Sequence, residues 1–212
     1  MRELLPRLAV PLTEKGALDP RSLFAAGTRK VWLEIGFGGG EHLAAQAAAN
    51  PDTGIIGCEP FINGVAKLLA DVERRHLANV RIHDNDARDV LESLADRSLD
   101  RVFLLFPDPW HKKRHHKRRF VSEETLDELA RIMVDGAEFR VATDIANYCR
   151  WTLREIRAHD AFEWLAEKPS DWRDRPDDWP GTRYEAKAVR EGRRPVYLTF
   201  RRRPRGAAGA AR

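Results

Sequence analysis

A glycine-rich segment near the N-terminus has the composition of a ligand-binding turn. Gly36, Gly38 and Gly40 let the backbone turn sharply and approach a ligand closely, and the start of a following helix would add oriented N–H donors. The dinucleotide-binding fingerprint requires a further glycine where this chain has Glu41. An acid there would repel a pyrophosphate, whereas Glu34 and Glu41 would favour the cationic ammonium and sulfonium groups of S-adenosylmethionine. The segment therefore favours methyl transfer over hydride transfer.

Two further acids follow predicted strands and could bind the nucleoside part of the same ligand. Glu59 follows a strand predicted at 54–58, where a carboxylate can accept hydrogen bonds from both ribose hydroxyls. NAD-binding proteins use the same device, so Glu59 does not separate the two classes. Asp86 follows a strand predicted at 80–83 and could accept from an adenine amino group, although a turn residue or a helix cap would have the same sequence.

A conformationally restricted acid precedes a strongly basic segment. Asp108 stands between Pro107 and Pro109 at the end of a strand predicted at 99–106, and the two prolines limit the backbone around it. Open α/β sheets bind ligands at this edge, so we expect Asp108 beside the cofactor pocket. Trp110 comes next, where it could stack on a base or simply pack.

The basic segment itself has two interpretations. Six of the eight residues from Lys112 to Arg119 are Lys or Arg, and the other two are His115 and His116. Joined to a fixed acid, such a run is typical of an enzyme that modifies a nucleic-acid base, because the acid can read the base edge while the cations hold phosphates. Taken alone, this run and a second cluster at 201–205 are equally consistent with a solvated surface. Neither lies on an obvious amphipathic helix, which favours nucleic acid over membrane as the partner.

These residues need a mostly parallel sheet to bring them to one edge. Apolar runs bounded by turn residues alternate with helical patterns, which predicts such a sheet with helices on both faces. Strands are predicted at 31–35, 54–58, 80–83, 99–106, 138–142, 162–166 and 196–201, and helices at 42–50, 63–75, 122–134 and 147–159. The segment 169–181, rich in Pro, Asp and Trp, is predicted to be a long, ordered loop.

The length of 212 residues predicts one compact α/β domain. We expect an N-terminal segment at 1–30, a domain at 31–203 with a cofactor half at 31–105 and a substrate and RNA half at 106–203, and a flexible basic tail at 204–212. Because no apolar run approaches the roughly 18 residues that span a bilayer, a cytoplasmic protein without a membrane partner is expected.

The two cysteines do not indicate a disulfide framework or a metal site. Cys58 and Cys149 lack metal-type spacing, so both are predicted to be small packing residues, and no metal cofactor is expected. The formal net charge of +4 is modest, and its uneven distribution along the chain is more informative than its sum.

The segment from Phe106 to Arg119 resembles the signature of the bacterial tRNA (guanine-N7)-methyltransferases, which methylate guanosine 46 in the tRNA variable loop. The resemblance extends over roughly 31–201, and it includes Thr143 with Asp144 and a later Thr-Arg-Tyr-Glu motif. It implies a single-domain, Rossmann-like class I methyltransferase fold with a seven-stranded sheet whose last strand is antiparallel. It also implies S-adenosyl-L-methionine as cofactor and tRNA as partner. The short N-terminus departs from relatives with an extension, which puts in doubt any RNA contact that such an extension would carry.

The resemblance assigns roles to individual residues. It implies cofactor binding by Glu34, Gly36, Gly38, Gly40, Glu59, Asp86 and Asp108, catalysis by Asp108, substrate binding by Lys112, Asp144, Thr182, Arg183, Tyr184 and Glu185, and RNA contact by Arg114, His115, His116, Lys117, Arg118 and Arg119. Structural alternatives remain for several of them. Asp144 could cap a helix beginning near Ile145, Thr182 and Glu185 have capping-box spacing, and Lys112 could be an ordinary surface lysine.

The implied reaction needs little proton chemistry. Guanine N7 carries a free lone pair and no proton, so attack on a methyl donor requires alignment and charge placement rather than an obligatory base. Asp144, Glu185 or Asp108 could hold the N1–H and amino group of guanine, and Asp108 is expected nearest the reaction. Because N7 lies on an edge that folded tRNA often occupies, the base is expected to be displaced.

Two alternative functions remain open at this point, and a monomer and a homodimer are both possible. An amino-methyltransferase of adenine or cytosine would often carry a second proline after the acid, which the sequence Asp108-Pro109-Trp110 lacks. A catalytically silent RNA-binding protein on the same scaffold would not need the intact glycine segment and the complete set of acids.

Overall fold

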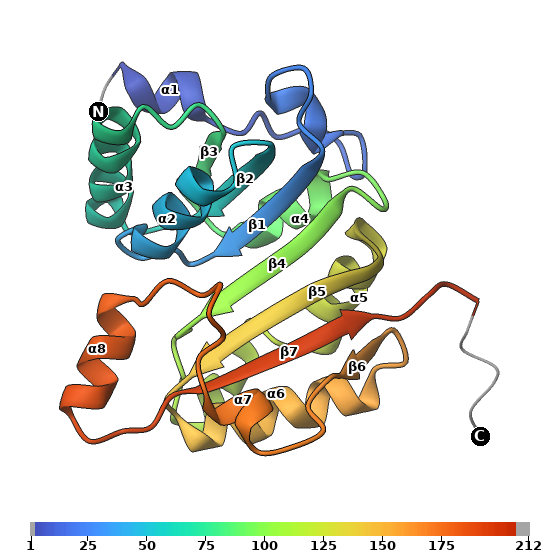
Figure 1. The fold of residues 1–212 in the computed structure, drawn as a ribbon. Coiled ribbons are helices and arrows are strands. Elements are labelled where there is room, and N and C mark those ends of the chain that lie inside the picture. The colour runs from blue at the N-terminus through green and yellow to red at the C-terminus, as the bar shows by residue number, and fades with distance from the viewer. Residues whose placement is uncertain (1–2, 207–212) are drawn as a thin grey trace.

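The computed structural model describes residues 3–206 and contains a seven-stranded sheet with helices on both faces (Figure 1). The strands are β1 (Lys30–Ile35), β2 (Thr53–Cys58), β3 (Val80–His83), β4 (Leu99–Leu105), β5 (Met133–Thr143), β6 (Phe162–Trp164) and β7 (Val196–Arg202). Their order in the sheet is β3-β2-β1-β4-β5-β7-β6. β7 runs antiparallel to β5 and β6, and the pairs among β1 to β5 are parallel. The predicted fold class is confirmed.

Two hydrophobic layers fix the helices to the sheet. The helices are α1 (Leu4–Leu8), α2 (Glu41–Ala49), α3 (Ile62–Arg75), α4 (Ala87–Ser93), α5 (Glu123–Ile132), α6 (Ala146–Ala158), α7 (Ser170–Arg173) and α8 (Arg183–Arg190), with 3-10 helices η1 (Pro20–Leu23) and η2 (Lys113–Arg118). Side chains alternate along each strand, so in β4 Val102 and Leu104 pack with α4, α5 and α6, whereas Phe103 and Leu105 pack with α1, α2 and α3. Figure 1 shows α5 and α6 behind the sheet.

The start of α5 agrees with the prediction, and its end does not. Ser122 accepts a hydrogen bond from the Thr125 N–H, and the Thr125 side chain returns one to Ser122, which forms a capping box. The helix ends at Ile132, and β5 begins at once with Met133, five residues before its predicted start. A register shift opposite Leu99 and Arg101, with Gly136 at a φ of 85°, accommodates the additional residues.

The segment 169–181 is ordered, as predicted, but it is not entirely a loop. It contains the one-turn helix α7, and Trp179 is only 3% exposed in the core beneath α2. Asp178 forms an ion pair with Arg140 at 2.8 Å. The burial of Trp179 and this ion pair fix the segment against β5 and β7.

Two arginines at the end of β7 and just after it, Arg202 and Arg205, contact the end of α5. Arg205 pairs with Asp135 and donates to the carbonyl groups of Ala130 and Arg131 at 2.7 and 2.8 Å, while Arg202, 8% exposed, donates to Ala130 at 2.9 Å. The last carbonyls of a helix lack partners within it, so the end of α5 attracts these guanidinium groups. Arg205, within the tail expected at 204–212, makes these contacts; the flexibility of the tail stays a prediction, and 207–212 lie outside the described residues.

Between residues 3 and 206, none of the helices is long and apolar enough to cross a membrane. The same part of the chain contains no group of three or more His, Cys, Asp or Glu side chains placed to hold a metal ion.

Candidate active site

The glycine segment forms a tight loop between β1 and α2. Gly36, Gly38 and Gly40 have φ values of 67°, 57° and 80°, a region that side chains with a Cβ rarely adopt. The N–H groups of Gly36 and Phe37 donate to the carbonyl of Cys58, at 2.8 and 3.3 Å, which folds the loop across the end of β2. The loop therefore lies at the carboxyl edge of the sheet, as the sequence predicted.

Close packing also requires these glycines. A Cβ at Gly38 would lie 2.7 Å from the ring of Tyr184, and one at Gly40 would lie 2.8 Å from Leu68. A Cβ at Gly64 in α3 would come within 2.0 Å of the Gly38 carbonyl oxygen. The loop is thus held between α3 on one side and the start of α8 on the other.

We predict that Gly38→Ala weakens S-adenosyl-L-methionine binding about tenfold, because a left-handed φ costs an L-residue roughly 1–2 kcal/mol and the new methyl group displaces the Tyr184 ring. Isothermal calorimetry measures the change. Gly136→Ala is the matched control: its φ is 85°, and a Cβ there meets nothing within 4 Å. This control should keep the wild-type affinity, and an unchanged affinity in Gly38→Ala would contradict the role of the loop.

Glu59 is fixed by the loop it faces. One carboxylate oxygen accepts from the Gly38 N–H at 2.7 Å and the other from the Phe61 N–H at 2.9 Å, and the side chain is 4% exposed. Each carboxylate oxygen can accept two hydrogen bonds, so both retain a lone pair for a ribose hydroxyl. The same residue can therefore order the loop and bind the nucleoside.

Glu34 lies in a buried chain of polar side chains that the sequence analysis did not identify. Its carboxylate is 2.7 Å from Nδ1 of His42, whose Nε2 is 3.3 Å from the Gln46 amide, which also donates to the Asp178 carbonyl at 2.6 Å. Glu34 and His42 are 2% and 1% exposed. The four-residue spacing of His42 and Gln46 places both on one face of α2, and that spacing was the available sequence signal.

A cavity of about 320 Å³ lies between the glycine loop and the end of β4. Gly36, Asp86 and Asp108 supply polar groups to its wall, and Ile35, Cys58, Leu104, Pro107 and Phe120 supply apolar surface. Burial raises the pKa of the Cys58 thiol, which keeps it protonated and makes it a packing residue. Asp86 also caps α4 by accepting from the Arg88 N–H at 3.0 Å, so the helix-cap interpretation is confirmed, while the contact with adenine stays a prediction.

Asp108 occupies a strained turn. Phe106 and Trp110, two non-glycine residues on either side of it, have φ values of 51° and 44°. The Phe106 N–H donates to the Ala142 carbonyl at 2.8 Å, which ties the start of the turn to β5. Surrounding contacts hold this turn, and Asp108, although exposed, lines both the cavity and a second hollow beside it.

Arg119 holds the other side of this turn, and the expectation that it contacts RNA is not supported. Its side chain is 1% exposed and lies over the rings of Tyr148 and Trp151, at 5.5 and 4.8 Å. It donates to the Pro109 carbonyl at 3.0 Å and to Asn147 at 2.5 Å. The basic run thus ends in a residue that packs inward, where the rings and two acceptors hold the guanidinium, although its Nη1 has no hydrogen-bond partner within residues 3–206.

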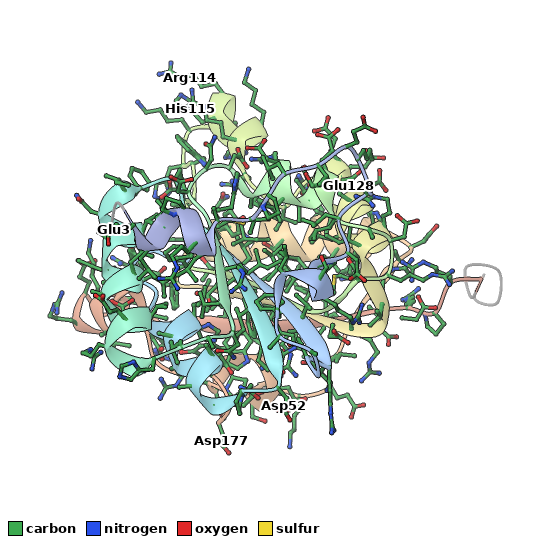
Figure 2. The ribbon with its side chains drawn as sticks, turned by 90° about the horizontal axis from the view of Figure 1, so that it is seen from above. Glu3, Asp52, Arg114, His115, Glu128 and Asp177 are labelled. Atoms are coloured by element: carbon green, nitrogen blue, oxygen red, sulfur yellow. The ribbon has the colours of Figure 1, made fainter. Side chains whose placement is uncertain are left out.

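The rest of the basic run is arranged around helix η2. Arg114 and His115 project from one side of the molecule (Figure 2), and Lys112, Lys117 and Arg118 are also exposed. His115 and His116 are half-buried, and His116 packs edge-on against Trp151 at 5.3 Å. The Arg118 guanidinium lies 4.8 Å from the Trp110 ring, and Trp110 lines a second hollow of about 470 Å³ with Asp108 and Lys112.

The Thr-Arg-Tyr-Glu motif begins α8 beside the glycine loop. Thr182 caps the helix by accepting from the Glu185 N–H at 3.1 Å, so the capping interpretation is correct and a helix follows. Arg183 forms an ion pair with Glu41 at 3.2 Å, and Tyr184 packs on Gly38. Glu41, expected to favour a cationic ligand, is thus already paired with a residue of the motif.

Two of the three acids expected to hold guanine, Asp144 and Glu185, are paired with arginine. Asp144 forms an ion pair with Arg193 and does not cap α6, whose N-cap is Ile145. Glu185 accepts from the Tyr197 hydroxyl at 2.6 Å and lies 3.5 Å from Arg175. Burial raises the pKa of Tyr197, and the Glu185 carboxylate raises it further, so the hydroxyl remains a donor.

The arrangement as a whole fits a nucleoside with a positively charged tail. The cavity combines apolar walls with two acids and the Arg118 side chain, and Gly36, with its left-handed φ, forms part of its wall. Glu59 stands between two of the lining residues, Cys58 and Pro60. Sheet order, antiparallel β7 and a glycine loop after β1 define a class I methyltransferase. A solved structure of an antibiotic-related methyltransferase shares this fold, with a TM-score of 0.60 at 17% identity over 94% of this chain and 98% of that one.

Sequence comparisons give the family. A family model described as "Putative methyltransferase" matches residues 28–198. A tRNA (guanine-N(7)-)-methyltransferase of Rhodospirillum rubrum is 53% identical over 207 residues, which are 96% of this chain and 81% of the relative. One of Ruegeria pomeroyi is 60% identical over 185 residues, 87% and 77% of the two chains. The chain belongs to the tRNA (guanine-N(7)-)-methyltransferase family.

Proposed function

We propose that this protein transfers the methyl group of S-adenosyl-L-methionine to N7 of guanosine 46 in tRNA. The observation that carries the proposal is the position of Asp108, held by a strained turn in the wall of the cavity beside the glycine loop. The names of the relatives support tRNA guanine N7 as the target. The choice of guanosine 46 rests on the resemblance of the motifs around Asp108, Asp144 and Thr182–Glu185.

S-adenosyl-L-methionine supplies an electrophilic methyl group on a sulfonium. Glu59 and Asp86 are the residues for its ribose and adenine, and the backbone of the Gly36–Gly40 loop is the surface for its methionine part. Glu34 is buried, and its carboxylate is hydrogen-bonded to His42, the second residue of the helix that follows the loop. These assignments place the nucleoside between the ends of β2 and β4.

The chain's own residues would align guanine rather than move protons. Positive charge passes to the purine ring as N7 is methylated, and a carboxylate already in place stabilises this charge without reorganisation. Asp108 is that carboxylate, and Lys112 borders the adjoining hollow, where the ring of Trp110 offers a stacking surface. Asp144 and Glu185 would accept the N1–H and amino group of guanine. Exposed cations of η2 would hold phosphates.

Incubation with unmodified tRNA and labelled S-adenosyl-L-methionine tests the proposal. Nucleoside mass spectrometry should find 7-methylguanosine, and a transcript carrying adenosine at position 46 should accept no label. An amino-methylated adenine or cytosine would overturn the target atom, and label in the altered transcript would overturn the position. If no tRNA is labelled although the protein binds the cofactor, the proposed activity is overturned and the alternative of a non-catalytic RNA-binding protein is favoured.

A further inference from the structure

A basic groove of about 950 Å³ lies beside the substrate motif. Four arginines and two aromatic residues contribute to its lining: Arg173, Arg175, Arg193, Arg194, Trp172 and Tyr197. Among the described residues that line it, Asp174 is the one acid. None of the lining residues that the structure describes belongs to η2, so the groove is a cationic surface separate from η2.

The arginines of the groove are of two kinds. Arg193 is paired with Asp144 and also with Glu191, and Arg175 is paired with Glu185; Asp144 and Glu185 are two of the three acids expected to hold guanine. Arg173 and Arg194 are exposed and form no ion pair within residues 3–206. The Arg173 guanidinium lies 4.8 Å from the centre of the Trp172 ring, and the residue is exposed.

We propose that this groove binds the phosphodiester backbone next to the target guanine, and that Arg193 and Arg175 exchange their carboxylate partners for phosphates as the RNA docks. The inference rests on the proposed function and extends it. A guanidinium fork matches phosphate as well as carboxylate. The arginine side chains are 38% and 44% exposed and can reach a phosphate in the groove, whereas Asp144 and Glu185 are only 11% and 16% exposed, so the donors of guanine would have to replace the arginines as their partners.

The exchange would solve a specific problem of the free enzyme. Asp144 and Glu185 can accept from the guanine N1–H and amino group only through oxygens that arginine does not occupy. Glu185 keeps its orientation after Arg175 leaves, because its other oxygen accepts from Tyr197 at 2.6 Å. Phosphate binding in the groove would thus release the groups that recognise the base.

The first test measures the affinity for tRNA as a function of salt concentration. The double variant Arg173→Gln/Arg194→Gln should raise the Kd for unmodified tRNA about tenfold and make the slope of log affinity on log salt shallower by about 1.4, for two lost phosphate contacts. Its Kd for S-adenosyl-L-methionine should not change. Arg29→Gln/Lys30→Gln removes two exposed charges at the opposite edge of the sheet and is the matched control.

The outcomes separate the groove from the proposed function. Suppose that Arg173→Gln/Arg194→Gln shows the same slope of log affinity on log salt as the wild type, while the wild type methylates tRNA. That result overturns the proposal that the groove binds phosphates and leaves the proposed function intact. A wild type that neither binds nor methylates tRNA overturns the proposed function first. A shallower slope in the Arg29→Gln/Lys30→Gln control, equal to that of the groove variant, would mean a non-specific charge effect and also overturns the groove.

The second test addresses the exchange and uses guanosine, which has no phosphate. Arg193→Gln frees Asp144, so guanosine should bind roughly threefold more tightly in an NMR titration. The same variant should bind tRNA more weakly, because a phosphate contact is lost. Opposite directions for the two ligands support the exchange, whereas guanosine affinity that is unchanged or weaker overturns it.

Discussion

Asp108→Asn is expected to lower kcat for tRNA methylation about 10²–10³-fold, the usual loss when a preorganised electrostatic group is removed from an active site. Asn keeps the size of the side chain and the position between two prolines, so the loss reports on charge rather than shape. We expect the free energy of unfolding to stay within about 0.5 kcal/mol of the wild type. Single-turnover measurements with saturating tRNA and cofactor isolate the chemical step from binding.

Asp52→Asn is the matched control for Asp108→Asn. Asp52 is an exposed acid directly before β2, at the opposite edge of the sheet from the cavity, and its loss should leave kcat unchanged. Undiminished turnover in Asp108→Asn would remove Asp108 from the mechanism and leave alignment by the remaining residues as the source of catalysis.

Arg119→Ala is expected to reduce the free energy of unfolding by about 3 kcal/mol, because it leaves the acceptors on Pro109 and Asn147 without a donor and opens a void between Tyr148 and Trp151. Urea unfolding followed by far-UV circular dichroism gives the value. Activity should also fall well below that of the wild type under folding conditions, since the turn that carries Asp108 loses one of its supports.

Arg114→Ala provides the contrast to Arg119→Ala. Arg114 is exposed on η2, so its removal should change stability by less than about 0.5 kcal/mol and make the salt dependence of tRNA binding shallower by about 0.7. If Arg119→Ala instead unfolds at the wild-type urea concentration and reduces the salt dependence, Arg119 contacts RNA and its buried role is wrong.

The predictable part of the fold is the part that local patterns encode. Buried strands such as 31–35 and 54–58 were predicted within a residue because both faces are covered, which gives short apolar runs bounded by turns. The early start of β5 at Met133 was not predictable, because a register shift opposite β4 is a property of the pair of strands. The one-turn helix α7 lacks the length that a periodic pattern needs.

The residues of the candidate site likewise include some that the sequence could predict and some that it could not. Positions at strand ends, such as Glu59 and Asp108, follow from the parallel sheet, and the structure places both beside the glycine loop or its cavity. Arg119 was misplaced because composition shows a basic run but not which of its members turns inward. The pairing of Arg183 with Glu41 joins residues from opposite ends of the chain, and no local pattern reports such a contact.

The position of β7 has a consequence for how the protein is made. The ribosome synthesises β6 before β7, yet β7 lies between β5 and β6, so β6 has no partner in the sheet until β7 emerges. α8, which completes the surroundings of Gly38, is synthesised about 140 residues after the glycine loop itself. The nascent chain therefore carries an open sheet edge until β7 has emerged, and its cofactor loop lacks the packing of Tyr184 until α8 has been made.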